Sequence, residues 1–319
     1  MTTDPGNSFA FRLDWNLLRT FLVIAEEQGI TRAANRLLRG QPAVSLALQR
    51  LENELDCRLV ERGRGSFRLT AAGRKLHAEV SELFSGVSQL PDSIGEAQNE
   101  LSGEVRILLA SHVITPLLDR QLTDFSQAHP KVRFTIRVET SSHVIQEVRD
   151  RQATLGICLV NRKLPDLTFT RMYREFFGFY CGRPHPLFGR ENLTAEDLRD
   201  FPFVAFDTEE IDNALRQIVM LRNDWGLTRA VTGRSSQLEE VRRMVTCGMG
   251  IGAFPIHVVR TDVERQLLWR LPPYDAPPAI DIHLVTNPRK HLNRAETRFL
   301  DDLQARIART PLPERTYNA

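Results

Sequence analysis

The stretch LLRTFLVIAEEQGITRAANRLLRGQPAVSLALQRLENELDCRLVERGRGSFRLTAAGRKL, residues 17–76, decides the fold of the first part of this chain. Three runs inside it carry apolar residues at helical spacing: residues 17–25, 31–38 and 41–55. Residues 58–70 then form two short runs on either side of a Gly-Arg-Gly turn, a pattern that predicts two short strands. Three helices followed by a two-stranded wing define a winged helix-turn-helix.

Helix starts and stops support this division. Asp14 can cap the first helix and Thr31 the second, because short polar side chains accept hydrogen bonds from free N–H groups at helix starts. Gly29 is predicted to end the first helix in a left-handed conformation. Gly40 separates the second helix from the third, which begins around Gln41-Pro42.

The third helix has two faces of different chemistry. Val44, Leu48, Leu51 and Leu55 form its buried stripe. The other faces supply the groups that we expect to read base edges: Gln41, Pro42, Ser45, Leu46 and Gln49. Leu46 offers an apolar contact to a thymine methyl group, although one exposed leucine is ordinary on any surface.

Basic residues gather in the same region. Ten basic and four acidic residues lie between Ile30 and Lys75, which suits a surface that docks on phosphates, although a solvated helical face would have the same charge. The predicted phosphate and backbone contacts are Thr31, Arg32, Arg50 and the wing-tip residues Arg62 and Arg64.

The 60-residue stretch resembles the DNA-binding domain of LysR-type transcriptional regulators, through QPAVS, the later RLE and the LTAAG exit. Gly40, Leu46 and Ala47 depart from the polar residues usual in that family. We therefore expect fewer direct hydrogen bonds to bases than is usual, with specificity resting on Gln41, Ser45, Gln49, thymine contacts and DNA shape.

A long helix follows Thr70, its predicted cap. Its apolar seam alternates at spacings of four and three, the pattern that pairs two helices, although an amphipathic helix packed on its own domain shows it too. The predicted dimerisation residues are Leu76, Val80, Leu83, Val87 and Leu90. Pro91 should end the helix near Leu90. In the resembled family this helix joins two heads on one interrupted inverted repeat.

From Gly103 onward, strands alternate with helices, which predicts an α/β fold with parallel strands. Two of the predicted strands are LTFTRMY and EFFGFYCG, and residues 211–223 are predicted as a helix. The segments VTCGMGIGAFP and RPHPL resemble the LysR-family effector domain. That resemblance implies two α/β subdomains like those of periplasmic binding proteins. The predicted boundaries are a head at 12–70, a linker helix at 71–100 and an effector domain at 101–310, with subdomain I at 101–164 and 278–310 and subdomain II at 165–277.

The resemblance also implies a ligand cleft at the carboxyl ends of the strands. The residues expected to line it are Ser111, His112, Ser141, Ser142, Phe206, Asp207, Thr208, Gly250 and Ile251. Hydroxyls and helix starts favour an anionic effector, whereas Asp207, Glu209 and Glu210 suit an amine. Each of these polar residues can also merely cap a helix.

Composition limits the alternatives. Four scattered cysteines and no export or membrane-spanning segment favour the cytoplasm. No nucleophile, metal-ligand or phosphate-loop motif is found, so we expect no enzyme activity, cofactor or metal. The sequence predicts a regulator that binds double-stranded DNA, a small metabolite and itself, as a dimer or tetramer, with RNA polymerase a further partner. The alternative is a cytoplasmic small-molecule binding protein or enzyme with an accessory helical domain.

Overall fold

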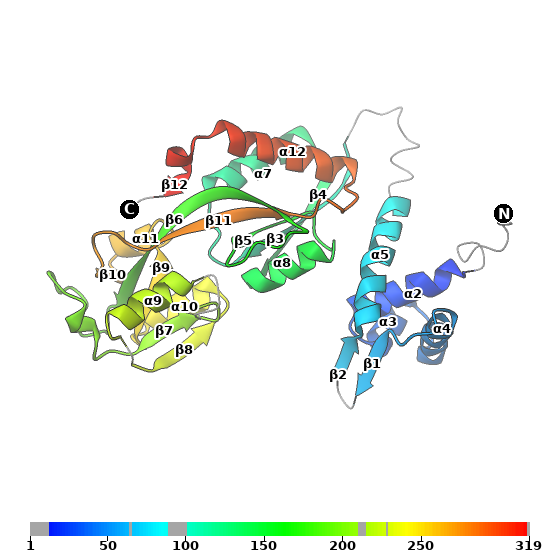
Figure 1. The fold of residues 1–319 in the computed structure, drawn as a ribbon, viewed down its shortest axis with the longest axis horizontal. Helices are drawn as coiled ribbons and strands as arrows, with labels where there is room; N and C mark the ends of the chain where they lie inside the picture. Colours follow the sequence, from blue (N-terminus) through cyan, green and yellow to red (C-terminus); the bar gives the residue numbers. More distant parts are fainter. Residues whose placement is uncertain (1–12, 64–65, 89–100, 210–214, 228, 318–319) are drawn as a thin grey trace. The chain divides into compact units, whose positions relative to one another are not determined.

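The chain forms two compact units in a computed structural model (Figure 1). Residues 1–99 with 150–152 make up the N-terminal unit, and the other residues make up the C-terminal unit. Each has its own hydrophobic core. The structure describes residues 13–63, 66–88, 101–209, 215–227 and 229–317. No helix in these ranges is long and apolar enough to cross a membrane.

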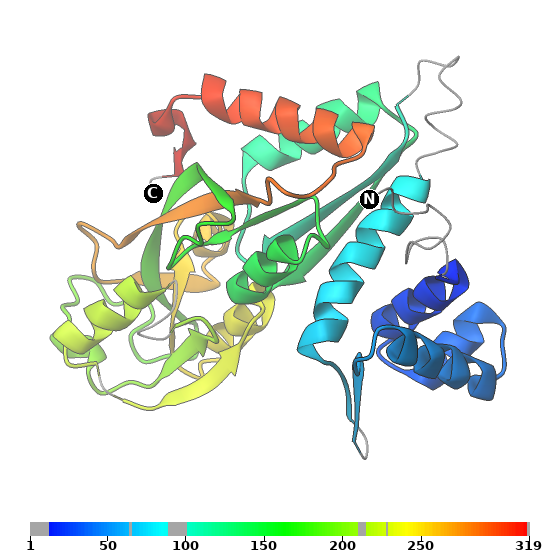
Figure 2. The same cartoon turned by 45° about the vertical axis from the view of Figure 1, so that its right-hand side comes forward.

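The N-terminal unit has the predicted order of elements. Its α2 (Trp15–Glu26), α3 (Ile30–Leu37) and α4 (Gln41–Glu54) are followed by β1 (Val60–Gly63), β2 (Ser66–Leu69) and α5 (Ala71–Ser88). The two strands pair antiparallel as the wing, and α5 continues from it as one long helix (Figures 1 and 2). The winged helix-turn-helix prediction is confirmed.

The helix stripes meet in one core. Phe21, Ile24, Leu48 and Leu51 are each fully buried, and Val44 is 1% exposed. Burying a side chain of this size stabilises the folded state by about 1.5–3 kcal/mol. This packing fixes α4 from its buried side and leaves its opposite face exposed.

The start of α3 differs from the prediction. Gln28, not Gly29, adopts the left-handed conformation, with φ 48°, while Gly29 is extended. The reason is that the Gly29 N–H bonds back to Ile24 O at 3.3 Å, which closes α2 one residue earlier. Thr31 therefore lies inside α3 and does not cap it.

The other two predicted caps are confirmed. Asp14 Oδ1 accepts a hydrogen bond from Asn16 N at 2.9 Å. Thr70 Oγ1 accepts one from Gly73 N, also at 2.9 Å.

The C-terminal unit is built on one continuous sheet with the order β4-β3-β5-β11-β6-β9-β7-β8, and β10 and β12 also pair with β6. Its strands are β3 (Gly103–Ala110), β4 (Val132–Glu139), β5 (Leu155–Leu159), β6 (Thr168–Gly182), β7 (Phe203–Phe206), β8 (Val231–Ser235), β9 (Ile251–Pro255), β10 (Leu268–Leu271), β11 (Ala279–Thr286) and β12 (Thr316–Tyr317). Its helices are α7 (Pro116–Ala128), α8 (Ser141–Arg149), α9 (Arg216–Asp224), α10 (Leu238–Thr246), α11 (Arg260–Glu264) and α12 (Arg294–Arg309), with short 3₁₀ turns at Glu196–Leu198 and Leu312–Arg315.

Two groups of parallel strands lie at the two ends of this sheet. Strands β3, β4 and β5 belong to subdomain I, where α7 and α12 lie together on one face and α8 on the other (Figure 1). Strands β7, β8 and β9 belong to subdomain II. Between the groups, β6 and β11 pair antiparallel. The sheet is mixed, because the two crossover strands run in opposite directions.

The predicted strands LTFTRMY and EFFGFYCG are one strand, β6, of 15 residues. No turn residue separates them, so the main chain stays extended from one subdomain into the other. Its first part pairs with β11 and its second part with β9 and β10. The predicted helix at 211–223 lies partly outside the described residues, and its described part is α9.

Candidate DNA-binding surface and effector site

The exposed face of α4 carries the residues predicted to read DNA. Gln41, Pro42, Gln49 and Arg50 are exposed, and Leu46 is 48% exposed. Ser45 is half-buried beside them. The described side chains of this predicted group therefore lie on one helix, opposite the buried stripe.

Glu52 connects α4 to the wing. Its side chain is 4% exposed, and its Oε1 accepts hydrogen bonds from Leu59 N at 2.9 Å and Val60 N at 3.3 Å. Its Oε2 lies 2.9 Å from Arg58 Nη1. The sequence analysis missed this role, although an acid next to the apolar stripe, in the RLE hallmark, indicates it. Glu52 positions the wing relative to the reading face.

The basic side chains divide into two groups. Arg36 Nη1 lies 2.7 Å from Glu26 Oε2 and 3.0 Å from Glu27 Oε1, so these two carboxylates neutralise the charge of Arg36. In the part of the chain that the structure describes, no ion pair involves Arg39, Arg50 or Arg68. These three exposed cations are available to phosphates, and of the three the sequence analysis singled out only Arg50.

The remaining predicted contacts lie around this face. Thr31 and Arg32 are exposed, and Arg32 donates a hydrogen bond to Gln28 O at 2.9 Å. Arg62 lies in β1, with only its main chain described. Arg64 lies outside the described residues.

The predicted dimerisation seam on α5 is split. Val80 is 1% exposed and packs into the core of its own unit, with half-buried Leu76 beside it. The prediction for Val80 needs correction, because a side chain already buried in its own domain has no surface left for a partner. Leu83 and Val87 are each 47% exposed. Leu90 lies outside the described residues.

The effector residues predicted in subdomain I share one edge of the sheet. Ala110 pairs with Glu139 at the carboxyl ends of the parallel strands β3 and β4. Ser111 and His112 follow the first strand, and Ser141 and Ser142 follow the second. Ser141 is 3% exposed, and its Oγ lacks a hydrogen-bond partner among the described residues.

Residues of subdomain II meet this edge. Phe206 pairs with Ser235 at the carboxyl ends of β7 and β8, and Asp207 N donates to Ser235 O at 3.1 Å. Ser111 Oγ reaches across, donating to Ser236 O at 2.9 Å and accepting from Leu238 N at 3.2 Å. The facing strand ends of the two subdomains are joined at Ser111.

Two of the other predicted effector residues have structural roles. Ile251 N donates to Pro202 O at 2.9 Å, so this N–H is already used. A Cβ on Gly250 would lie 2.5 Å from the same carbonyl oxygen, so glycine is needed for this close approach. Thr208 is half-buried and Asp207 exposed, and both remain available at the edge.

Glu209 contributes from inside subdomain II. It is 5% exposed, accepts from Phe206 N at 3.0 Å and lies 3.5 Å from Arg222. Burial raises the pKa of Glu209 to about 7, against the opposing effects of the Phe206 N–H and the charge of Arg222. Glu209 therefore supports the end of β7 and does not face a ligand. Glu210 lies outside the described residues.

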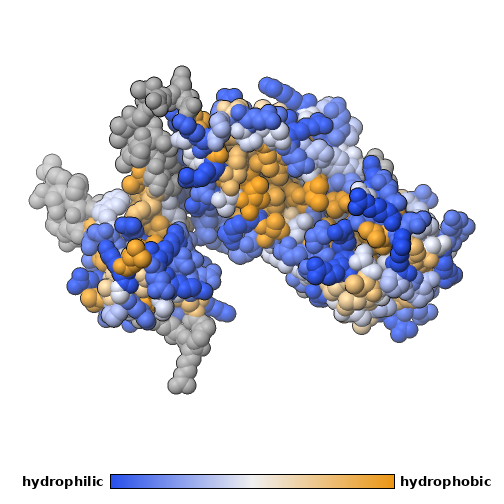
Figure 3. Space-filling view, turned by 180° about the vertical axis from the view of Figure 1, so that it is seen from behind, coloured by the Kyte–Doolittle hydropathy of each residue, from blue (hydrophilic) through white to orange (hydrophobic). Residues whose placement is uncertain are grey.

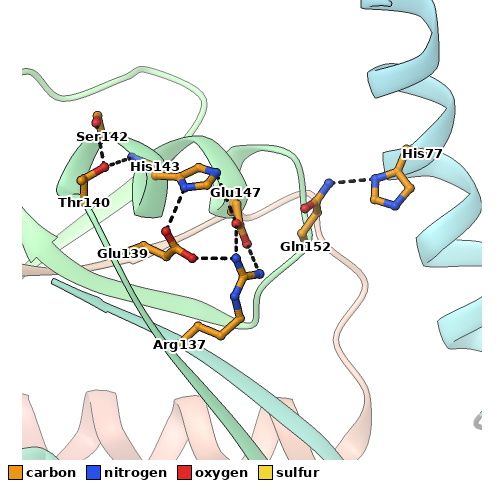
Figure 4. A network of polar contacts seen from close by, with 8 residues as sticks. All are labelled: His77, Arg137, Glu139, Thr140, Ser142, His143, Glu147 and Gln152. Atoms are coloured by element: carbon orange, nitrogen blue, oxygen red, sulfur yellow. Dashed lines mark hydrogen bonds and ion pairs between the residues drawn. The ribbon is translucent and has the colours of Figure 1, made fainter. Parts of the chain in front are cut away.

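A charged network fixes the first turns of α8 (Figure 4). Glu139, His143 and Glu147 lie close enough together to hold a metal ion. However, Arg137 Nη2 already lies 2.7 Å from Glu139 Oε1 and 3.0 Å from Glu147 Oε1. With both carboxylates paired to one guanidinium, the group is better explained as an ion-pair network that holds α8 on β4.

The two units together define a class of protein: a winged helix-turn-helix head with an exposed reading helix, followed by a two-subdomain α/β sensor. Residues 15–74 match the family model described as "Bacterial regulatory helix-turn-helix protein, lysR family". Residues 98–308 match the family model described as "LysR substrate binding domain". The chain belongs to the LysR family of transcriptional regulators, whose members carry an effector-binding domain.

Individual relatives agree with this assignment. The chain is 33% identical over 211 residues to the SDS degradation transcriptional activation protein of a Pseudomonas species, covering 64% of this chain and 69% of the relative. It is 26% identical over 293 residues to the transcriptional activator BauR of Pseudomonas aeruginosa, covering 90% and 93%.

Solved structures show the same fold. CbnR, a LysR family transcriptional regulator, superposes with a TM-score of 0.65 at 16% identity, covering 92% of this chain and 99% of CbnR. A full-length OxyR variant from Pseudomonas aeruginosa gives a TM-score of 0.64 at 18% identity, covering 97% and 99%.

Proposed function

We propose that this regulator binds an interrupted inverted repeat upstream of its target genes, as a dimer or tetramer. In this proposal α4 of each copy enters a major groove while the wing contacts the flanking backbone. A small-molecule effector bound where the two subdomains meet shifts the relative placement of the paired heads. The chain acts in the cytoplasm, together with RNA polymerase, and has no catalytic step of its own.

One observation carries the DNA-binding part of the proposal. The described side chains predicted to read bases lie on the exposed face of α4, and Arg50 next to them has no ion pair among the described residues. A helix held by its buried stripe and presenting such a face fits a major groove.

Exposed apolar side chains support self-association. Leu83 and Val87 on α5 are available to a second helix. On the C-terminal unit, Ile136 and Val138 are 44% and 45% exposed on β4, an edge strand of the sheet. Apolar side chains also gather over one face of this unit (Figure 3). Two separate self-association surfaces are consistent with either a dimer or a tetramer.

The effector part rests on the joined strand ends. Ser111 and Ser236 link the carboxyl edges of both subdomains, where ligands of open α/β sheets bind. The buried Ser141 hydroxyl at the start of α8 has no hydrogen-bond partner among the described residues and lies at this edge.

Salt-dependent DNA binding tests the proposal. Arg62→Ala and Arg64→Ala should weaken binding to every sequence and each reduce the slope of log affinity against log salt by about 1, because each removes about one phosphate contact. Arg190→Ala is the matched control, since it removes an exposed cation from the C-terminal unit. Unchanged affinity of both wing variants on a native promoter fragment would exclude the wing from the interface.

A further inference from the structure

Glu175 lies where β6 passes from one subdomain into the other. It pairs with Ile280 of β11, whereas Phe177, two residues later, pairs with Pro255 of β9. Side chains alternate along a strand, so Tyr173, Glu175 and Phe177 point to the same side. This carboxylate is therefore located on the crossover strand that joins the two subdomains.

The Glu175 side chain is completely buried, and neither of its oxygens has a hydrogen-bond partner among the described residues. The nearest basic atoms are His112 Nε2 at 3.8 Å and His257 Nε2 at 4.0 Å, both beyond hydrogen-bonding distance. A buried polar group without a partner destabilises the folded state, so such a group needs an explanation.

Its neighbours supply a further acceptor. His257 Nε2 lies 3.0 Å from Ile114 O and must donate to it, because a carbonyl oxygen only accepts. The opposite nitrogen of a neutral His257, Nδ1, is then an acceptor, and it too lacks a described partner. The ionised Glu175 carboxylate and this nitrogen are acceptors without a described partner, which suits a ligand that brings N–H donors, as an ammonium group does.

The titratable groups around Glu175 favour neutral forms in the ligand-free protein. Burial raises the pKa of Glu175 well above its usual range. Burial, with a smaller contribution from His257, lowers the pKa of His112 to about 4. Burial also lowers the pKa of His257 and raises that of Tyr173. No described cation balances the carboxylate, so a cation brought by a ligand would restore its charge.

The site adjoins the predicted effector residues. The centroid of the His112 ring lies 6.2 Å from that of Phe177 and 6.3 Å from that of Phe206. His112 therefore lies between the Glu175 carboxyl group and the end of β7. A ligand that reached Glu175 would thus contact the crossover and both subdomains together. The affinity for such a ligand would differ between two relative placements of the subdomains, and effector control requires such a difference.

We propose that Glu175 anchors the positively charged head of the effector, and that the effector is a small organic molecule with a primary ammonium group. This inference rests on the proposed function of the C-terminal unit as an effector sensor. It gives a role to a buried acid that has no hydrogen-bond partner among the described residues.

The first test needs no ligand. Glu175→Gln removes the buried acid but keeps its shape. The pKa of Glu175 is raised in the folded state. As the pH rises above the pKa that this acid has in the unfolded chain, the acid therefore lowers the stability of the folded state increasingly. At pH 8.5 the ligand-free full chain carrying Glu175→Gln should unfold at least about 2 °C above wild type. A lower unfolding temperature would show that Glu175 is a structural partner and overturn the proposal.

The second test uses small primary amines, each matched with the alcohol and the carboxylate of the same carbon skeleton. At least one amine should raise the unfolding temperature of the full chain by about 2 °C or more. Glu175→Gln should lose this shift and the control Glu264→Gln, an exposed acid of the same unit, should keep it.

A shift retained in Glu175→Gln, or the absence of any shift with the amines, would overturn the proposal. If only alcohols or carboxylates stabilise the chain, effector binding stands and the ammonium assignment fails. Salt-dependent binding of the same protein samples to DNA tests the proposed DNA-binding function separately from effector binding.

Discussion

Glu52 accepts the main-chain hydrogen bond of Leu59 at 2.9 Å, which ties the C-terminal part of α4 to the first strand of the wing. The two elements that we propose to contact DNA are thereby held in one geometry, although they are separate in sequence. A buried carboxylate is suited to this task, because it also accepts from Val60 N and pairs with Arg58.

Removing this carboxylate should loosen the wing. Glu52→Ala leaves the buried N–H groups of Leu59 and Val60 without an acceptor, and we expect a loss of about 1–3 kcal/mol in the stability of the N-terminal unit. Glu52→Gln keeps one acceptor oxygen and loses mainly the pair with Arg58, which is 77% exposed, so it should cost less than about 1 kcal/mol. Native-state hydrogen exchange of the Leu59 and Val60 amides measures the difference. Equal exchange in the two variants would contradict this role.

Ser111 should hold the subdomains together. Ser111→Ala removes both hydrogen bonds that cross to Ser236 and Leu238, at a cost of about 1–3 kcal/mol, or several degrees in the unfolding temperature. Ser126→Ala, which removes an exposed hydroxyl from α7, is the control and should change little.

The bulky substitution Ser111→Trp should abolish effector-induced thermal stabilisation while leaving DNA-binding by the head intact. A retained stabilisation would exclude Ser111 from the effector site.

Lowering the pH should destabilise the C-terminal unit, because His112 is protonated more readily in the unfolded chain than in the folded protein. Its pKa is about 4 in the folded protein against 6.5 unfolded, because burial disfavours the charged ring. The folded state therefore binds fewer protons between these values, and its stability falls as the pH drops from 6.5 to 4. The full effect is about 3 kcal/mol.

Urea unfolding of His112→Gln over this pH range checks the prediction, with exposed His291→Gln as control. The His112 variant should show a shallower loss of stability than wild type. A slope as steep as that of wild type would mean that His112 is not the group responsible.

The sequence predicted the head well because its determinants are local. The spacing of Val44, Leu48 and Leu51 fixes which face of α4 is buried, and therefore which face carries Leu46 and Gln49. The conformation of Gln28 was not predictable in this way, because the main-chain bond from Gly29 to Ile24 decides it.

Long-range contacts explain what the sequence did not show. Glu52 and Glu175 matter because of groups brought to them by distant parts of the chain. The segment EFFGFYCG held a usable indication, since Glu175 begins an otherwise apolar strand interior. Likewise the α5 seam alone could not separate Val80, which packs inward, from exposed Leu83 and Val87.

Selection of preferred sites from random DNA tests the central claim most directly. The wild-type chain should select an interrupted inverted repeat, and Leu46→Ala should relax the preference for thymine at one symmetric pair of positions. Each lost thymine-methyl contact should cost about 1–3 kcal/mol of discrimination. The control Leu83→Ala, on α5, should leave the half-site sequence unchanged. An unchanged preference in Leu46→Ala would contradict base reading by this face of α4, and the absence of any selected repeat would contradict the account as a whole.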